Sequence, residues 1–145
     1  KWANLNNILV IILTNQSGIA RGYLTESELI TINNYIATEF AKMGAQIDDW
    51  FYCPFHEEGA GRYRKKSLLR KPFPGMALLA ADKHNICLHR SFMVGDKLSD
   101  QLKLVDLDSF LLEGGYIRGK NINSEYKTYQ SIDEIHKVLI QSSSR

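Results

Sequence analysis

Short apolar runs alternate with amphipathic segments along the chain, which is the pattern of strands that alternate with helices. Residues 8–13 are apolar throughout and rich in β-branched side chains, as in a strand buried on both faces of a parallel sheet. Residues 47–53, 91–95 and 110–112 predict three further strands. This alternation favours an α/β domain with a mainly parallel sheet and flanking helices.

Capping signals and apolar spacing predict the first long helix. Thr25 and Glu28 form a capping-box pattern, and Gly44 can end the helix. Apolar side chains recur along it at helical spacing, at Leu29, Ile32, Ile36, Phe40 and Met43.

Three more helices are predicted later in the chain. One begins near Pro74, a residue type that suits a first helical turn, and one spans residues 98–104. The last opens with the capping pattern of Ser131 and Glu134 and runs to about residue 141.

Length, charge and cysteine content narrow the class of protein. The 145 residues suffice for one domain, and no repeat or linker divides them. The net charge of +2 is too small to imply a nucleic-acid or membrane partner, and no apolar run approaches the ~20 residues of a membrane helix. The two cysteines, Cys53 and Cys87, are too few for a disulfide framework and favour a reducing cytoplasm.

Groups suited to phosphate and Mg²⁺ follow two predicted strands and precede one helix. Residues 14–18 (TNQSG) offer a hydroxyl, amides and a glycine, and Asp96-Lys97 offers a carboxylate and an ammonium. Arg70-Lys71 stands just before the helix near Pro74. Ligands bind beyond the carboxyl ends of parallel strands, so these groups are expected to meet there around a phosphoryl group and a divalent cation.

Two other signals have weaker support. Residues 62–71 (RYRKKSLLRK) are basic enough for a nucleic-acid patch, but no matching basic face or binding motif accompanies them. They are better explained as a lip that attracts an anionic substrate. Residues 114–121 nearly spell a phosphate-binding loop, but Asn121 stands where Ser or Thr must hold Mg²⁺.

The order of the motifs resembles a known family. The segments VIILTNQSGIARG, CPFH, RKPFPGM and FMVGDKLSD follow one another as in the haloacid-dehalogenase (HAD) superfamily of phosphatases, and more narrowly as in its heptose-bisphosphate and histidinol-phosphate phosphatases. The similarity is close over about residues 1–105. It implies a Rossmann-like HAD fold and a Mg²⁺-dependent phosphomonoesterase that works through an aspartyl-phosphate intermediate.

The resemblance also implies a role for each candidate residue. Thr14, Arg70 and Lys71 are the expected catalytic residues, of which Thr14 orients the phosphoryl group while Arg70 and Lys71 hold it and stabilise developing charge. Asp96 is the expected Mg²⁺ ligand, and Asp100 is expected to support the metal site or a helix start. The expected substrate contacts are Thr14, Asn15, Gln16, Ser17, Arg70, Lys71 and Lys97.

The chain departs from the family pattern in its missing nucleophile. The family carries it in an Asp-x-Asp-Gly motif on a central strand ahead of VIILTNQSG, and the sequence contains no such motif. The spacing of Asp106 and Asp108 is right, but they follow the Gly-Asp motif instead of preceding it. We therefore expect residues 1–145 to be an N-terminally truncated single phosphatase domain whose central strand, between those ending at Thr14 and Asp96, is absent.

The chain also departs from the family pattern in its zinc ligands. Related enzymes often bind structural zinc through Cys-x-His and a later Cys-x-Cys. Here Cys53 and His56 are present, but Ser67 and Leu69 replace the later pair, and two ligands cannot close a tetrahedral site. Zinc is not expected, so packing must hold the loop, with Tyr63 and Leu68 as candidates.

Together these observations predict a cytoplasmic, monomeric phosphatase of a small phosphorylated sugar, without nucleic-acid or membrane partners. Removal of the 7-phosphate from D-glycero-D-manno-heptose 1,7-bisphosphate is the leading activity, and histidinol phosphate is the alternative substrate. If the chain is complete, it is instead a phospho-ligand-binding module without a nucleophile.

Overall fold

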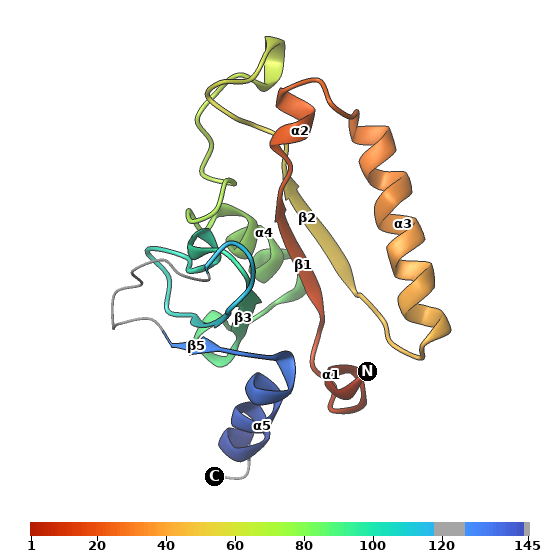
Figure 1. Ribbon diagram of the computed structural model, residues 1–145, viewed down its shortest axis with the longest axis vertical. Coiled ribbons are helices and arrows are strands. Elements are labelled where there is room, and N and C mark those ends of the chain that lie inside the picture. Colours follow the sequence, from red (N-terminus) through yellow and green to blue (C-terminus); the bar gives the residue numbers. More distant parts are fainter. Residues whose placement is uncertain (118–126, 144–145) are drawn as a thin grey trace.

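Parallel strands and flanking helices form the molecule, as the sequence predicts (Figure 1). The computed structural model describes residues 1–117 and 127–143. Its strands are β1 (Ile11–Asn15), β2 (Asp49–Cys53), β3 (Phe92–Gly95), β4 (Asp108–Leu112) and β5 (Thr128–Tyr129). Its α-helices are α1 (Trp2–Leu5), α2 (Ser17–Ala20), α3 (Glu26–Lys42), α4 (Gly75–His84) and α5 (Ile132–Ser143). Three 3₁₀ turns complete it, η1 (Gly61–Tyr63), η2 (Leu88–Arg90) and η3 (Leu98–Asp100).

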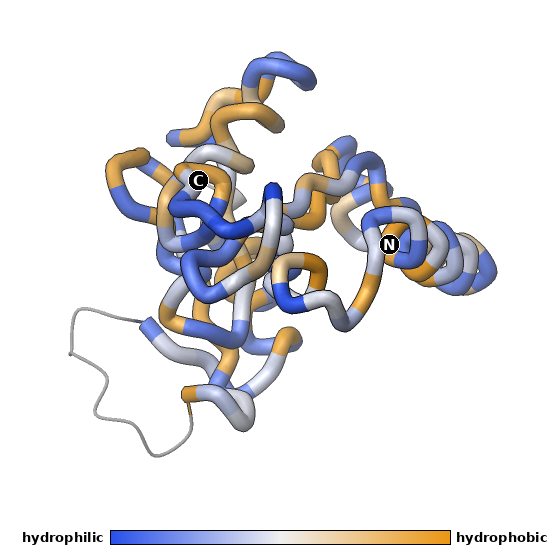
Figure 2. The backbone as a smooth tube through the Cα atoms, turned by 90° about the horizontal axis from the view of Figure 1, so that it is seen from above, coloured by the Kyte–Doolittle hydropathy of each residue, from blue (hydrophilic) through white to orange (hydrophobic). Residues whose placement is uncertain are grey.

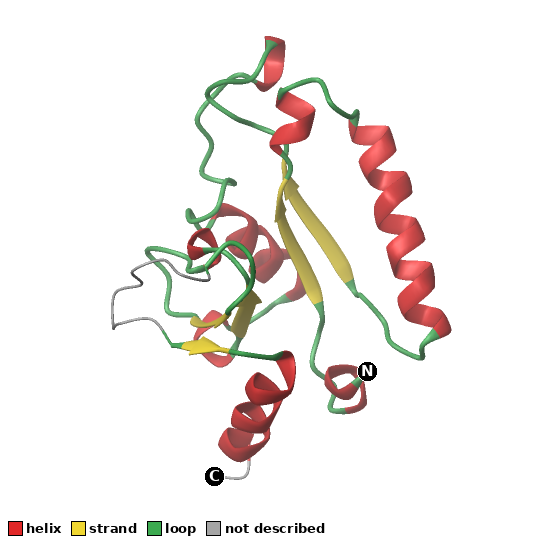
Figure 3. Cartoon of the chain, in the orientation of Figure 1, coloured by secondary structure: helices red, strands yellow, loops and turns green. Residues whose placement is uncertain are grey.

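The strands form two separate parallel sheets in the described part of the chain (Figure 3). In the first, β1 pairs with β2, from Ile11 opposite Asp49 to Asn15 opposite Cys53. In the second, β4 lies between β3 and β5. The predicted α/β class and the parallel pairing are confirmed, but the described strands do not join into one continuous sheet.

One edge of β1 has no neighbouring strand among the described residues. Asp48 N donates to Val10 O at 2.8 Å, so the even-numbered residues of this segment bond toward β2. Backbone groups alternate from side to side along a strand, and those of the odd-numbered residues 11, 13 and 15 therefore point away from β2. Every residue of β1 is only half-buried, whereas the apolar run predicts burial on both faces. The open edge explains this difference.

The core is correspondingly small. The chain exposes 9826 Å² of solvent-accessible surface. A compact monomer of 16.6 kDa exposes about 7,600 Å² by the scaling of surface with mass. The buried hydrophobic side chains come mainly from α2, α4 and the ends of strands: Ile19, Ala20, Leu29, Cys53, Met76, Ala77, Ala80, Leu111, Ile117 and Ile135.

Helix α3 confirms the predicted capping box but not a fully covered apolar face. Thr25 Oγ1 accepts from Glu28 N, and the Glu28 carboxylate accepts from Thr25 N at 2.7 Å. Of the predicted apolar positions Leu29 is buried, whereas Phe40 and Met43 are 41% and 63% exposed. The helix lies at the outer side of the molecule beyond β2 (Figure 1) and shows both apolar and polar segments along its coil (Figure 2). Among the described helices, none is long and apolar enough to span a membrane.

The helix predicted over residues 98–104 is wrong. Only the single turn η3 forms there, and Leu104 adopts a left-handed backbone with φ +65°. The side chain of Asp100 turns back to accept hydrogen bonds from the backbone N–H groups of Asp96 and Lys97, which favours a tight turn over a continued helix. The short α1, α2 and β5 were not predicted, and Asn121 of the near phosphate-binding loop lies outside the described residues.

An ion-pair cluster joins the start of β2 to the end of α4, which packs against both strands of the first sheet. Asp49 Oδ2 lies 2.7 Å from Lys83 Nζ and 2.6 Å from His84 Nε2. Burial alone would raise the pKa of Asp49, but the hydrogen bonds from Lys83, His84 and Trp50 N lower this pKa from 3.8 to about 2. The ionised carboxylate is therefore favoured in the folded state.

This cluster predicts a specific acid sensitivity. Since the pKa of Asp49 is depressed on folding, its stabilisation is complete above about pH 4 and is lost as the pH falls toward 2. Asp49→Asn should lower the urea midpoint at neutral pH and flatten the dependence of that midpoint on pH between 4 and 2. Asp82→Asn is the control, because Asp82 is exposed and lies on α4, the helix that carries Lys83 and His84. Parallel acid profiles for wild type and Asp49→Asn would contradict the assignment.

Candidate active site

The predicted site residues lie where three segments of the chain meet. Thr14 and Asn15 end β1, and Gln16 and Ser17 begin the short helix α2. Arg70 and Lys71 lie in the loop ahead of α4, while Asp96 and Lys97 directly follow β3. The hydrogen bonds among these residues show which of them come together.

Asn15 is joined to Lys71 through a paired amide contact. Lys71 N donates to Asn15 Oδ1 at 2.9 Å, and Asn15 Nδ2 donates to Lys71 O at 3.1 Å. This pairing places the segment of residues 70–71 against the carboxyl end of β1. It also uses both polar groups of the Asn15 side chain, so in this structure Asn15 positions the loop.

The ammonium of Lys71 is buried between the two sheets. Lys71 Nζ donates to Leu13 O at 2.7 Å, on the open edge of β1, and lies 2.6 Å from Asp100 Oδ1. The two side chains of this ion pair are only 11% and 6% exposed. Lys71 thus ties the end of β1 to the turn that follows β3.

Asp100 shapes the turn that carries Asp96. Its Oδ2 accepts from Asp96 N at 3.1 Å and from Lys97 N at 3.0 Å. Gly95 is required beside it, because a Cβ there would overlap the Asp100 side chain. The Asp96 carboxylate itself has no hydrogen-bond or ion-pair partner among the described residues, so it remains available to a ligand.

The other polar candidates differ in the contacts that their side chains make. Thr14 Oγ1 accepts from Gln16 Nε2 at 3.0 Å, which couples two of the expected substrate contacts. Lys97 Nζ lies 4.2 Å from the ring centroid of Tyr116, a cation–π contact at an exposed position. Ser17 makes no side-chain contact with the other candidates in the described structure.

Arg70 lines a basic cavity and keeps an unsatisfied donor. Its Nη1 is buried and has no hydrogen-bond partner within the described part of the chain. A buried guanidinium nitrogen without a partner is costly, and an anion would satisfy it. The cavity has a volume of about 500 Å³ and is lined by His56, Glu57, Lys65, Lys66, Ser67, Leu68, Arg70, Lys71, Pro72 and Phe73.

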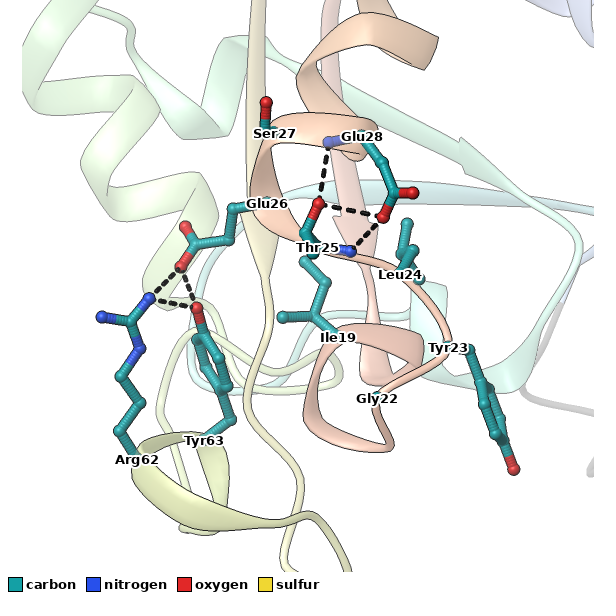
Figure 4. A pocket seen from close by; sticks show the side chains of 10 residues that line it. All are labelled: Ile19, Gly22, Tyr23, Leu24, Thr25, Glu26, Ser27, Glu28, Arg62 and Tyr63. Carbon is teal, nitrogen blue, oxygen red and sulfur yellow. Dashed lines mark hydrogen bonds and ion pairs between the residues drawn. The ribbon is translucent and has the colours of Figure 1, made fainter.

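A second cluster holds the loop that forms this cavity (Figure 4). The Glu26 carboxylate accepts from the hydroxyl groups of Tyr52 and Tyr63, and Arg62 Nη2 lies 3.6 Å from it. Glu26, Arg62 and Tyr63 line a neighbouring cavity of about 650 Å³. Packing by Tyr63 and Leu68 was expected to hold the loop. Tyr63 holds it through a hydrogen bond to Glu26, whereas Leu68 is 70% exposed. Glu26 was not predicted, since it has the sequence signal of an ordinary first-turn acid.

The cysteine and histidine of the CPFH segment do not gather further ligands. Cys53 is fully buried, with its Sγ 3.8 Å from Phe55 O, and His56 Nδ1 accepts from Glu58 N at 3.1 Å. Within residues 1–117 and 127–143, no group of three or more His, Cys, Asp or Glu side chains is placed to hold a metal ion.

Comparison with known proteins supports the HAD resemblance. The sequence profile of a family described as polynucleotide kinase 3 phosphatase matches residues 1–137. A D-glycero-beta-D-manno-heptose-1,7-bisphosphate 7-phosphatase from Pasteurella multocida is 45% identical over 94 residues, which are 65% of this chain and 51% of that protein. The chain thus spans about half the length of the curated relatives it matches.

Two solved structures share the fold. A protein described as a HAD-like phosphatase from Mesorhizobium loti has a TM-score of 0.81 and 30% identity, over 95% of this chain and 67% of its own. The D,D-heptose 1,7-bisphosphate phosphatase from B. bronchiseptica, complexed with magnesium and phosphate, has a TM-score of 0.80 and 24% identity, over 97% and 79%. The predicted HAD-like α/β fold is confirmed.

The Lys71–Asp100 pair should couple strongly in a double-mutant cycle. Lys71→Met leaves the Asp100 carboxylate buried and unpaired, which should cost about 3–5 kcal/mol in the free energy of unfolding. Asp100→Asn should cost a comparable amount, and the double variant much less than the sum, because both charges then leave together.

Denaturant titration measures these losses. Lys42→Met is the matched control, because Lys42 pairs with Glu39 at the surface with 66% of its side chain exposed. That change should cost no more than about 0.5 kcal/mol. Additive losses in the Lys71 and Asp100 cycle would show that the two charges do not depend on each other.

Proposed function

The chain belongs to the polynucleotide kinase 3 phosphatase family, and from that premise we propose that it forms part of a Mg²⁺-dependent phosphomonoesterase. The substrate is a small phosphorylated sugar, with D-glycero-D-manno-heptose 1,7-bisphosphate and loss of its 7-phosphate as the leading case. The enzyme is proposed to act as a monomer in the cytoplasm, which the two free thiols of Cys53 and Cys87 support.

The buried Nη1 of Arg70, which has no hydrogen-bond partner among the described residues, is the observation that carries this proposal. This nitrogen requires an acceptor, and a phosphoryl oxygen is the acceptor that arginine binds best. Thr14, at the end of β1, supplies a hydroxyl to orient the same group. Lys71, already bonded to Leu13 O and Asp100, adds positive charge from a fixed position and so needs little reorganisation when charge develops.

Asp96 is the residue that would hold Mg²⁺. A carboxylate is a hard oxygen ligand, and Mg²⁺ is usually bound by one or two carboxylates together with water and substrate phosphate. The half-buried Asp96 is unpaired among the described residues and its backbone is fixed by Asp100, so the donor set fits. When bound, the cation would neutralise phosphate charge during transfer.

The nucleophile is proposed to enter on a strand that pairs with the open edge of β1. The support is structural: the N–H and C=O groups of residues 11, 13 and 15 point away from β2, and β3 begins a separate sheet. As the resemblance implies, a carboxylate on that strand attacks phosphorus and displaces the sugar oxygen, which takes a proton from a second aspartic acid. Water then hydrolyses the aspartyl-phosphate.

The activity test is Mg²⁺-dependent phosphate release. The polypeptide translated from the upstream reading frame is compared with the 145-residue chain, on heptose 1,7-bisphosphate, histidinol phosphate and an oligonucleotide with a 3′ phosphate. We expect turnover only for the longer polypeptide, highest on the heptose. Phosphate binding without turnover by both would support a phospho-ligand module, and preference for another substrate would overturn the sugar assignment.

Arg70→Ala should then reduce kcat/KM of the active polypeptide by about 10²–10³-fold, the usual loss when one stabilising donor is removed. Arg90→Ala is the control, because Arg90 lies in η2 at the amino end of β3, away from Asp96. An Arg70→Ala enzyme with the same kcat/KM as the Arg90→Ala control would contradict the assigned role. Steady-state kinetics at saturating Mg²⁺ measures both.

A further inference from the structure

Besides the contacts of Lys71 at its carboxyl end, the loop between β2 and α4 is held at two further places, and one of them leads to the cavity wall. Its first half docks on α2, where Ala60 N donates to Ala20 O at 2.8 Å and Gly59 approaches Ala20 too closely for a side chain. An exposed ion pair of 3.0 Å between Arg21 and Glu58 accompanies this contact. The second half, from Gly61 onward, has a different anchor.

That anchor is the carboxylate of Glu26, in the first turn of α3. It accepts from Tyr52 Oη, on β2, at 2.6 Å, and from Tyr63 Oη in the loop. Figure 4 shows Glu26 facing Arg62 and Tyr63 across the gap between helix and loop. One carboxylate therefore joins the helix, the strand and the loop.

The backbone of Tyr63 connects this anchor to the cavity wall. Its carbonyl oxygen accepts from His56 N at 3.1 Å and from Lys65 N at 3.0 Å. Both of these residues line the 500 Å³ cavity that contains Arg70. The side chain of Tyr63 is thus fixed by Glu26, while its backbone holds two residues that line the same cavity as Arg70.

We propose that Glu26 is a positioning residue for the anion cavity and that it acts through Tyr63. This inference rests on the proposed function only for its kinetic consequence, since the anchoring itself is a property of the fold. The residue holds the loop by hydrogen bonds between side chains of this chain.

The protonation states make the anchor strong at neutral pH. The hydrogen bonds from Tyr52 and Tyr63 lower the pKa of Glu26, and the hydrogen bond to Glu26 raises the pKa of Tyr52 to about 12. The carboxylate therefore stays ionised and the Tyr52 phenol stays protonated. Hydrogen bonds to a charged acceptor of this kind are about twice as strong as neutral ones.

Two tyrosine variants separate positioning from general stability. Tyr63→Phe and Tyr52→Phe each remove one hydroxyl from the same carboxylate, but only Tyr63 belongs to the loop. Trypsin reports loop opening through cleavage at the exposed Arg64, Lys65 and Lys66. Cleavage at Arg62 is not counted, because Arg62 Nη2 itself donates to Tyr63 Oη at 2.6 Å. Tyr63→Phe should speed cleavage there about tenfold, and Tyr52→Phe by less than about twofold.

Glu26→Ala should open the loop as Tyr63→Phe does, and the double variant should open it no further. Glu39→Ala, on the same helix, is the matched control and should leave cleavage unchanged. In the active polypeptide, Tyr63→Phe should raise KM several-fold with little change in kcat, since the wall shapes binding and Arg70 is intact.

Equal protection of the loop in Tyr63→Phe and Tyr52→Phe would overturn the proposal. So would additive cleavage rates for Glu26→Ala and Tyr63→Phe, or an unchanged KM beside a protease-sensitive loop. The proteolysis readout needs no turnover. If the Tyr63→Phe loop opens as expected while the longer polypeptide releases no phosphate from any of the tested substrates, the proposed function is rejected and the anchoring role stays in place.

Discussion

The buried ammonium of Lys71 is the constraint on which the site depends. A buried charge is tolerated only when its partners are close and well oriented, and Lys71 finds them in Leu13 O and Asp100. Leu13 belongs to β1 and Asp100 to the turn after β3, so satisfying one charge fixes the end of β1 against that turn. Two hydrogen bonds between the Asn15 side chain and the Lys71 backbone strengthen the same junction. Arg70 directly precedes Lys71, and the backbone of Asp96 is bonded to Asp100, so the Lys71–Asp100 pair also places these two candidates.

The edge of β1 is open because, among the described residues, no strand of the second sheet pairs with the first. Apolar residues at this edge remain half-buried, and the total surface of 9826 Å² exceeds that of a compact chain of this mass. An unpaired strand edge can accept another strand, and this edge is where the proposed nucleophile strand would pair.

The sequence predicts local features well wherever they depend on neighbouring residues. The capping box of Thr25 and Glu28, the parallel strands and the start of α4 after Pro74 all follow from short-range rules. Features that depend on distant partners escape such rules. Asp100 looks like a helix residue until its carboxylate meets Lys71, and Glu26 looks like a helix-start acid until two tyrosines from elsewhere reach it.

The same distinction bears on the proposed anion site, in a chain with a net charge of only +2. Three cations of segment 62–71 are already paired with acids: Lys71 with Asp100, Arg62 with Glu26, and Lys66 with Glu57 at 3.4 Å. Counting basic residues therefore misplaces the site toward the exposed segment 62–66. What distinguishes Arg70 from these cations is a buried nitrogen, Nη1, that finds no acceptor among the described residues. The proposal therefore depends on the burial of this one donor and not on the number of basic residues around it.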